Sequence, residues 1–147
     1  ALEAIQKGTD IVTDTNMALA GINKRALARH GGEAHCFMAD EKVAALAKER
    51  GVTRATVSME FAAQLNKPVI FAVGNAPTAL IRLYEMIAGG EFRPAFIIGV
   101  PVGFVNVEAA KELILKTDVP YIINRGRKGG SNVAAAICNA LLYELGR

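Results

Sequence analysis

Short apolar runs alternate along the chain with longer stretches whose apolar residues recur at helical spacing. The short runs predict strands, and the longer stretches predict helices. We expect strands at Asp10–Asp14, Ala34–Met38, Val69–Val73, Pro94–Ile98 and Val119–Asn124, the last of them buried. We expect helices at Ala1–Lys7, Thr15–Arg29, Glu41–Arg50, Arg54–Leu65, Ala79–Ala88, Val107–Lys116 and Asn132–Leu145.

Three consecutive strand–loop–helix units in the second half predict a parallel sheet with helical crossovers. The expected fold is therefore α/β, with three α/β/α layers, a mostly parallel sheet and a single domain over residues 1–147. The helix ends carry recognisable signals. Asp40, Thr53 and Ser131 are expected N-caps, and Gly21-Ile22-Asn23 is expected to interrupt the second helix.

Ligands of parallel α/β folds bind at the carboxyl ends of the strands. Three loops should therefore lie along one edge of the sheet: GNAPTA from Gly74, GVPVGFV from Gly99 and RGRKGGS from Arg125. The second loop is apolar for a surface turn, so we expect a flat apolar ligand or a subunit interface to cover it. In the third loop, glycines and cations precede a helix, which favours anion binding. The alternative for this loop is a tight turn with solvated cations.

The composition of the chain excludes several classes of function. The 147 residues are 52% hydrophobic and carry a net charge of +3, without a membrane-length apolar run or a signal peptide. Aromatic residues make up 6% and tryptophan is absent, which argues against a nucleic-acid stacking platform. No metal-binding cluster or standard phosphate-loop motif is present. The residues themselves thus indicate a cytoplasmic α/β protein that binds an anionic, partly apolar ligand.

Three further side chains could carry chemistry, each with a structural alternative. Asp14 ends the first predicted strand, where it could hold a ligand or cap the following helix. His30 and His35 flank a Gly31-Gly32 turn and could be catalytic, or could serve as surface or packing residues. No Ser/His/Asp arrangement or paired-carboxylate motif accompanies them.

Four segments, in order, resemble the precorrin-8X methylmutase family, also called cobalt-precorrin-8 methylmutases or precorrin isomerases. They are IVTDTNMALAGINK (Ile11–Lys24), GNAPTAL (Gly74–Leu80), GVPVGFV (Gly99–Val105) and RGRKGGS (Arg125–Ser131). The resemblance implies a homodimeric α/β isomerase of cobalamin biosynthesis that moves a methyl group from ring carbon 11 to ring carbon 12 without an external cofactor or metal. The substrate would be a corrinoid tetrapyrrole with a carboxylate rim; the resemblance leaves open whether it carries cobalt.

The resemblance also implies site residues. Arg54 matches an arginine of the family's active site. Substrate-binding roles are implied, without individual assignment, for the motif positions Asp14, Met17, Asn75, Thr78, Pro101, Val102, Gly103, Phe104, Arg125, Arg127, Lys128, Gly129, Gly130 and Ser131.

The histidine that acts as the family's acid/base would precede Ala1, and neither His30 nor His35 matches it. The chain thus resembles a family member that lacks its N-terminal segment. We therefore expect binding residues but no catalytic residue within it. Two alternatives remain: a corrinoid-binding protein without catalysis, and a phosphate- or nucleotide-binding domain that uses Arg125–Ser131.

Overall fold

A computed structural model gives the structure of residues 2–103, 106–124, 126 and 128–145. Its strands are β1 (Asp10–Thr13), β2 (Ala34–Cys36), β3 (Val69–Val73), β4 (Phe96–Gly99) and β5 (Tyr121–Ile123). Its helices are α1 (Leu2–Gln6), α2 (Asn16–Gly21), α3 (Lys24–Ala28), α4 (Glu41–Arg50), α5 (Arg54–Ala63), α6 (Pro77–Ala88), α7 (Val107–Leu115) and α8 (Ser131–Leu145). The predicted elements are thus present, with boundaries that shift by a few residues.

The strands form one sheet in the order β2-β1-β3-β4-β5, and every neighbouring pair is parallel. The chain runs from β1 outward to β2, then returns to the other side of β1 and continues outward through β3, β4 and β5. The winding direction therefore reverses between β1 and β3. In open α/β sheets, the carboxyl ends of the strands on either side of such a reversal form the usual binding crevice.

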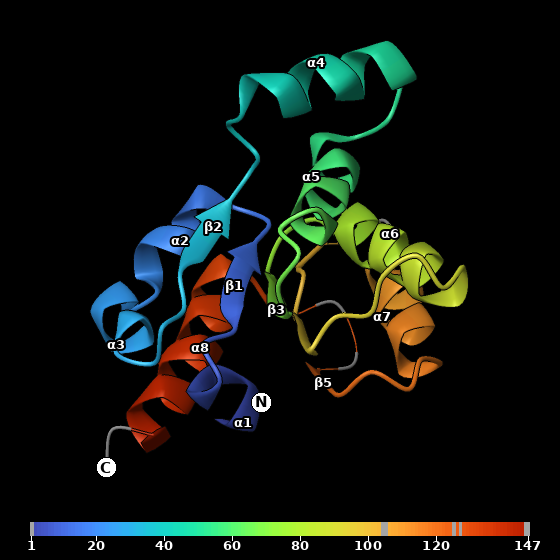
Figure 1. Ribbon diagram of the computed structural model, residues 1–147. Helices are drawn as coiled ribbons and strands as arrows, with labels where there is room; N and C mark the ends of the chain where they lie inside the picture. Colours follow the sequence, from blue (N-terminus) through green and yellow to red (C-terminus); the bar gives the residue numbers. More distant parts are fainter. Residues whose placement is uncertain (1, 104–105, 125, 127, 146–147) are drawn as a thin grey trace.

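Helices cover both faces of the sheet, which confirms the expected three layers (Figure 1). Side chains alternate along a strand, so β3 places Phe71 on one face and Ile70 on the other. The Phe71 side packs against α5, α6 and α7. The Ile70 side packs against α1, α3 and α8, and α2 lies against α8. Helix α4 stands away from the sheet and packs on α5 through Val43 and Val57 (Figure 1).

Most of the predicted helix ends are confirmed by side-chain hydrogen bonds. Asp40 and Thr53 accept backbone N–H groups of α4 and α5. The second helix is interrupted as expected, because Asn23 accepts the N–H of Ala26 and starts α3. The prediction for Ser131 is wrong, since this residue is already the first residue of α8. Its hydroxyl pairs with the hydroxyl of Thr15, 2.7 Å away.

The predicted burial of the last strand is also wrong. Tyr121 and Ile122 are 39% and 37% exposed. The physical reason is the position of β5, which is the last strand in the sheet order and pairs with β4 on one side. An apolar run predicts a strand, but it does not distinguish a central strand from an edge strand. Among the described residues, no helix is long and apolar enough to cross a bilayer.

Candidate functional site

A cavity of about 450 Å³ lies where the loops after β1, β3, β4 and β5 meet. Its position is the carboxyl edge of the sheet, where the winding direction reverses. The described parts of the three predicted binding loops therefore share one edge, as expected. The cavity is lined by Thr15, Met17, Gly74, Asn75, Val102, Gly129, Gly130, Ser131 and Asn132.

Asp14 organises the loop after β3 from beneath the cavity. Its side chain is fully buried. One carboxylate oxygen accepts the N–H of Gly74 at 2.8 Å, and the other accepts those of Asn75 and Ala76 at 2.8 and 2.6 Å. Burial raises the pKa of Asp14, and the three N–H donors oppose this rise. Both oxygens are thus committed to the turn that leads into α6, so Asp14 positions the loop from below.

The loop after β3 lies directly against the start of α8. A Cβ atom added to Gly74 would lie 2.7 Å from both the Gly130 carbonyl oxygen and the Ser131 Cα. Only glycine allows this backbone approach. The Thr15–Ser131 hydroxyl pair joins the loop after β1 to the same helix end. Three segments that are far apart in the sequence therefore form one continuous surface.

The loop after β4 is fastened to the loop after β5 in the same way. The N–H of Gly130 donates to the carbonyl oxygen of Val100 at 2.8 Å. A Cβ atom on Gly129 would lie 1.9 Å from that oxygen, so no side chain fits there. The glycine pair that the sequence places next to the cations thus permits close contact between two loops, in addition to forming a turn.

Apolar side chains face solvent at this otherwise polar site. Met17 is 65% exposed and Val102 is 44% exposed, and both line the cavity. The loop after β4 is only partly open, since Val100 and Pro101 are buried within the protein. The surface therefore combines hydroxyl and amide groups with two exposed apolar side chains, which suits a ligand that has both a polar rim and an apolar face.

Two of the cations that the sequence indicates are exposed. Lys128 is exposed and immediately precedes the glycines that line the cavity. Arg54 is exposed at the start of α5. The cap of that helix, Thr53, hydrogen-bonds the Thr78 hydroxyl at 3.0 Å, so the starts of α5 and α6 lie together. Arg125, Arg127 and Phe104, which the sequence also indicates, lie outside the described residues.

The cavity includes six of the sequence-predicted residues: Met17, Asn75, Val102, Gly129, Gly130 and Ser131. Asp14 lies below it, and Gly103 packs beside Val107 at a φ of +142°. Sequence reasoning did not single out Thr15, Gly74 or Asn132 as lining residues. Each of these three residues is adjacent in the sequence to a residue that was predicted to bind the ligand, and this adjacency could have indicated them.

Neither histidine lies at this edge. His35 on β2 bonds Asp10, the first residue of β1, with a distance of 2.9 Å between Nε2 and the carboxylate. The His30 carbonyl lies beside Gly8, just before the same strand. The chain contains only these two histidines; His30 lies at the amino edge of the sheet, and the His35 side chain, from the middle of β2, bonds Asp10 at that edge. They are therefore placed to support structure at the opposite end from the cavity.

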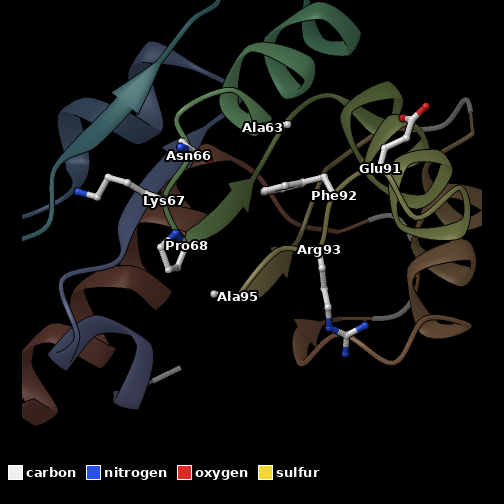
Figure 2. Close-up of a pocket in the computed structure, with 8 residues that line it drawn as sticks. All are labelled: Ala63, Asn66, Lys67, Pro68, Glu91, Phe92, Arg93 and Ala95. Atoms are coloured by element: carbon white, nitrogen blue, oxygen red, sulfur yellow. The ribbon is translucent and has the colours of Figure 1, made fainter.

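A second cavity, of about 470 Å³, lies at that amino edge (Figure 2). The side chains of Lys67 and Arg93 extend away from each other there. Lys67 pairs with Asp10 at 2.8 Å, and Arg93 pairs with Asp118. Because these cations do not converge on a common point, this cavity has no evident anion-binding geometry, and the carboxyl edge is the better candidate.

The fold and the site define a class: a parallel α/β protein whose ligand site lies at the carboxyl edge of the sheet, where the winding direction reverses. The comparisons with known proteins give the family. The family model described as precorrin-8X methylmutase matches residues 1–144. The chain belongs to this family, and the alternative of a phosphate- or nucleotide-binding domain finds no support.

Individual proteins that are similar to this chain are named as methylmutases of the same family. A cobalt-precorrin-8 methylmutase of Salmonella typhimurium is 46% identical over 144 residues, which cover 97% of this chain and 67% of that protein. For a protein of the same name from Priestia megaterium, the identity is 44%, with 95% and 62% covered. A solved structure of a precorrin-8x methyl mutase from Thermus thermophilus superposes with a TM-score of 0.86 at 40% identity, covering 97% of this chain and 69% of the other.

Proposed function

We propose that this protein takes part in corrin-ring biosynthesis as an isomerase, binding a corrinoid polycarboxylate at the carboxyl edge and moving a methyl group between adjacent ring carbons. The observation that carries this proposal is the cavity formed by the family's motif loops. A corrin is a broad apolar ring with carboxylates around it. Exposed Met17 and Val102 can face the ring, while Lys128 and Arg54 can meet carboxylates.

For the chemistry, the described residues bind and orient. An intramolecular methyl migration gains most from a fixed substrate geometry, with a proton or hydrogen bond supplied at the ring. The hydroxyls of Thr15 and Ser131 lie at the cavity and pair with each other, so one of their two O–H groups can donate to a substrate oxygen. Neither histidine is at this edge, so we assign neither one a role in proton transfer.

We propose cobalt-precorrin-8, rather than its metal-free counterpart, as the substrate. The relatives named for the cobalt compound from Salmonella typhimurium and Priestia megaterium are 46% and 44% identical to this chain. A precorrin-8X methylmutase of Pseudomonas aeruginosa is 40% identical. The cobalt ion here belongs to the substrate, so no protein ligand for it is required.

The test is a turnover assay with cobalt-precorrin-8 and with metal-free precorrin-8X. We expect a product of unchanged mass and altered absorbance, formed faster from the cobalt substrate. Equal rates would overturn the cobalt preference. Saturable binding without any product would favour the second candidate, a corrinoid-binding protein without catalysis. The observation in favour of this candidate is that neither histidine lies at the cavity. An absence of both binding and product would overturn the function.

We also propose that the protein is a homodimer, as the family resemblance implies, and that it is cytoplasmic, as its composition indicates. Support comes from β5, an edge strand with partly exposed Tyr121 and Ile122. Unprotected apolar edge strands tend to pair with another chain. Light scattering should give twice the monomer mass, and Ile122→Lys should lower it. As a control, Tyr143→Lys places the same charge at a 57% exposed position on α8 and should leave the mass unchanged. A monomeric wild-type protein would contradict the proposal.

A further inference from the structure

Lys111 is a fully buried lysine, only 1% exposed, on the face of α7 that also carries Val107, Ala110 and Ile114. A buried ammonium group is costly unless hydrogen bonds compensate for lost hydration. Lys111 Nζ donates to the Asn124 side-chain oxygen at 3.2 Å and to the carbonyl oxygens of Gly126 and Lys128 at 2.8 and 3.0 Å. All three of its N–H donors can therefore be satisfied.

These acceptors belong to one segment, the basic loop between β5 and α8. The Asn124 amide strengthens the arrangement by donating to the Lys128 carbonyl oxygen at 2.7 Å. That oxygen thus accepts from two side chains. Burial lowers the pKa of Lys111, while the carboxylate of Glu108 acts in the opposite direction. Asn124, Gly126 and Lys128, which are described residues of the loop, are consequently fastened from inside by a side chain of α7.

The direction of these bonds matters for an anion. Carbonyl oxygens carry partial negative charge, and a loop that turned them outward would repel a carboxylate. Here the carbonyls of Gly126 and Lys128 are directed to the buried ammonium. The Lys128 side chain remains exposed, and the next four residues, Gly129 to Asn132, line the cavity. The surface offered to a ligand is therefore freed of two unfavourable groups.

We propose that Lys111 is a positioning residue that fixes the basic loop between β5 and α8 in the conformation that receives a carboxylate of the ligand. The ligand part of this proposal rests on the proposed function. The positioning part concerns the free protein and can be measured without any ligand.

The experiment compares Lys111→Met with the wild-type protein. Methionine has a similar length but donates no hydrogen bond. Lys116→Met is the matched control, because it removes the same charge from an exposed position just after α7. Should Lys111→Met fail to fold, Asn124→Ala removes one acceptor and the second donor from a half-buried site.

Two readouts separate positioning from general stability. Hydrogen exchange of the amides of residues 124, 126 and 128–130 should rise about tenfold or more relative to those of β3, since an anchoring charge-assisted bond is lost. The affinity for a corrin polycarboxylate should also fall by about tenfold, which is the size of effect expected for the loss of one charge-assisted hydrogen bond. Affinity for a corrin whose side chains are amides should change less. Lys111→Arg should restore part of the loop protection, because it keeps a charged donor.

Exchange that rises equally in the loop and in β3 would overturn the proposal, since Lys111 would then be an ordinary core residue. A loosened loop with unchanged polycarboxylate affinity would overturn its role in binding. If the wild-type protein binds no corrin, the proposed function fails. In that case, loop-specific exchange would still support positioning by Lys111, and its absence would overturn it.

Discussion

Asp14 and Lys111 are fully buried charged side chains whose bonds are directed mainly to loop backbone. Asp14 holds the N–H groups of one loop, and Lys111 holds the carbonyl oxygens of another. Each ion is compensated by hydrogen bonds, so removing either side of such an arrangement leaves unpaired polar groups in the interior. We therefore expect these two positions to be more sensitive to substitution than the exposed residues above them.

Asp14→Asn tests the first arrangement. An amide has one acceptor oxygen, and its NH₂ group would face backbone N–H donors, so at least one N–H is left unpaired. We expect a loss of about 1–3 kcal/mol in the free energy of unfolding, measured in urea. Asp40→Asn is the control, because Asp40 accepts a single N–H, that of Lys42, at the exposed start of α4. Equal losses for the two variants would contradict the structural role of Asp14.

Asp10 provides a pH-dependent prediction. Its burial alone would raise the pKa of the carboxyl group, but hydrogen bonds from Lys67, His35 and the Glu33 N–H outweigh burial and lower it. A lowered pKa adds stability above the pKa of the unfolded chain, and this stability is lost as the pH falls through the folded-state pKa. The difference in unfolding free energy between wild type and Asp10→Asn should therefore shrink between about pH 5 and pH 3.

Urea unfolding of the wild-type protein and of Asp10→Asn at several pH values checks this prediction. Other acids, such as Glu60 with its lowered pKa, titrate in both variants and cancel in the difference. A difference that stays constant over this range would show that Asp10 contributes no ionisation-linked stability.

Sequence reasoning located Asp14 but could not assign its role, and it did not identify Lys111. An aspartate after a strand can cap a helix, bind a ligand or hold a loop, and these uses share one sequence pattern. Lys111 did leave a signal. It lies at the spacing of Val107, Ala110 and Ile114, so the helical pattern placed a lysine on the apolar face. The reason for its position became visible only with the loop in place.

Strands and helices were largely predictable, because each depends on a local pattern. The interruption before α3 followed from Asn23, which caps that helix. The two errors concern neighbours far away in the sequence. Whether β5 is an edge depends on which strands flank it, and the Ser131 hydroxyl is engaged by Thr15, 116 positions earlier. Patterns within a segment carry no information on either point.

The close contact between the β4 and β5 loops yields a prediction about one glycine. In Gly129→Ala, the new methyl group would lie 1.9 Å from the Val100 carbonyl oxygen, so the loops must separate. We expect destabilisation of about 2 kcal/mol or more, together with weaker ligand binding. In Gly90→Ala, after α6, the Cβ meets no atom within 4 Å and only a φ of +71° is strained, which should cost about 1 kcal/mol.

Urea unfolding and corrin titration of both glycine variants provide the measurement. The two substitutions add the same methyl group at different ends of the sheet. If Gly90→Ala reduced both stability and binding as much as Gly129→Ala, the contact between the two loops would not explain why position 129 is a glycine.

The site as a whole was predictable to the extent that parallel topology gathers loops at one edge. Strands β1, β3, β4 and β5 all end there, so segments from Asp14 to Asn132 meet around one cavity. The sequence could not show which residues of each loop reach the cavity. That choice depends on backbone contacts such as those of Gly74 and Gly129, which only the assembled molecule reveals.

Arg54 tests how far the site extends beyond this cavity. It is exposed at the start of α5, which the Thr53–Thr78 hydrogen bond places beside the start of α6. Arg54→Ala should weaken binding of a corrin polycarboxylate by about 1–3 kcal/mol, because a carboxylate loses its charge-assisted partner. Arg29→Ala, at an exposed position just after α3, is the control. Unchanged affinity in Arg54→Ala would remove this residue from the site.

The most direct test of the account is an absorbance titration of the wild-type protein with a corrin polycarboxylate, such as cobyrinic acid. The account predicts a saturable spectral change with one site per chain, reduced by Gly129→Ala and by Arg54→Ala. Saturable binding that both substitutions leave unchanged would place the ligand elsewhere. The absence of any saturable change would contradict the central claim that the carboxyl edge of this sheet is a corrinoid site.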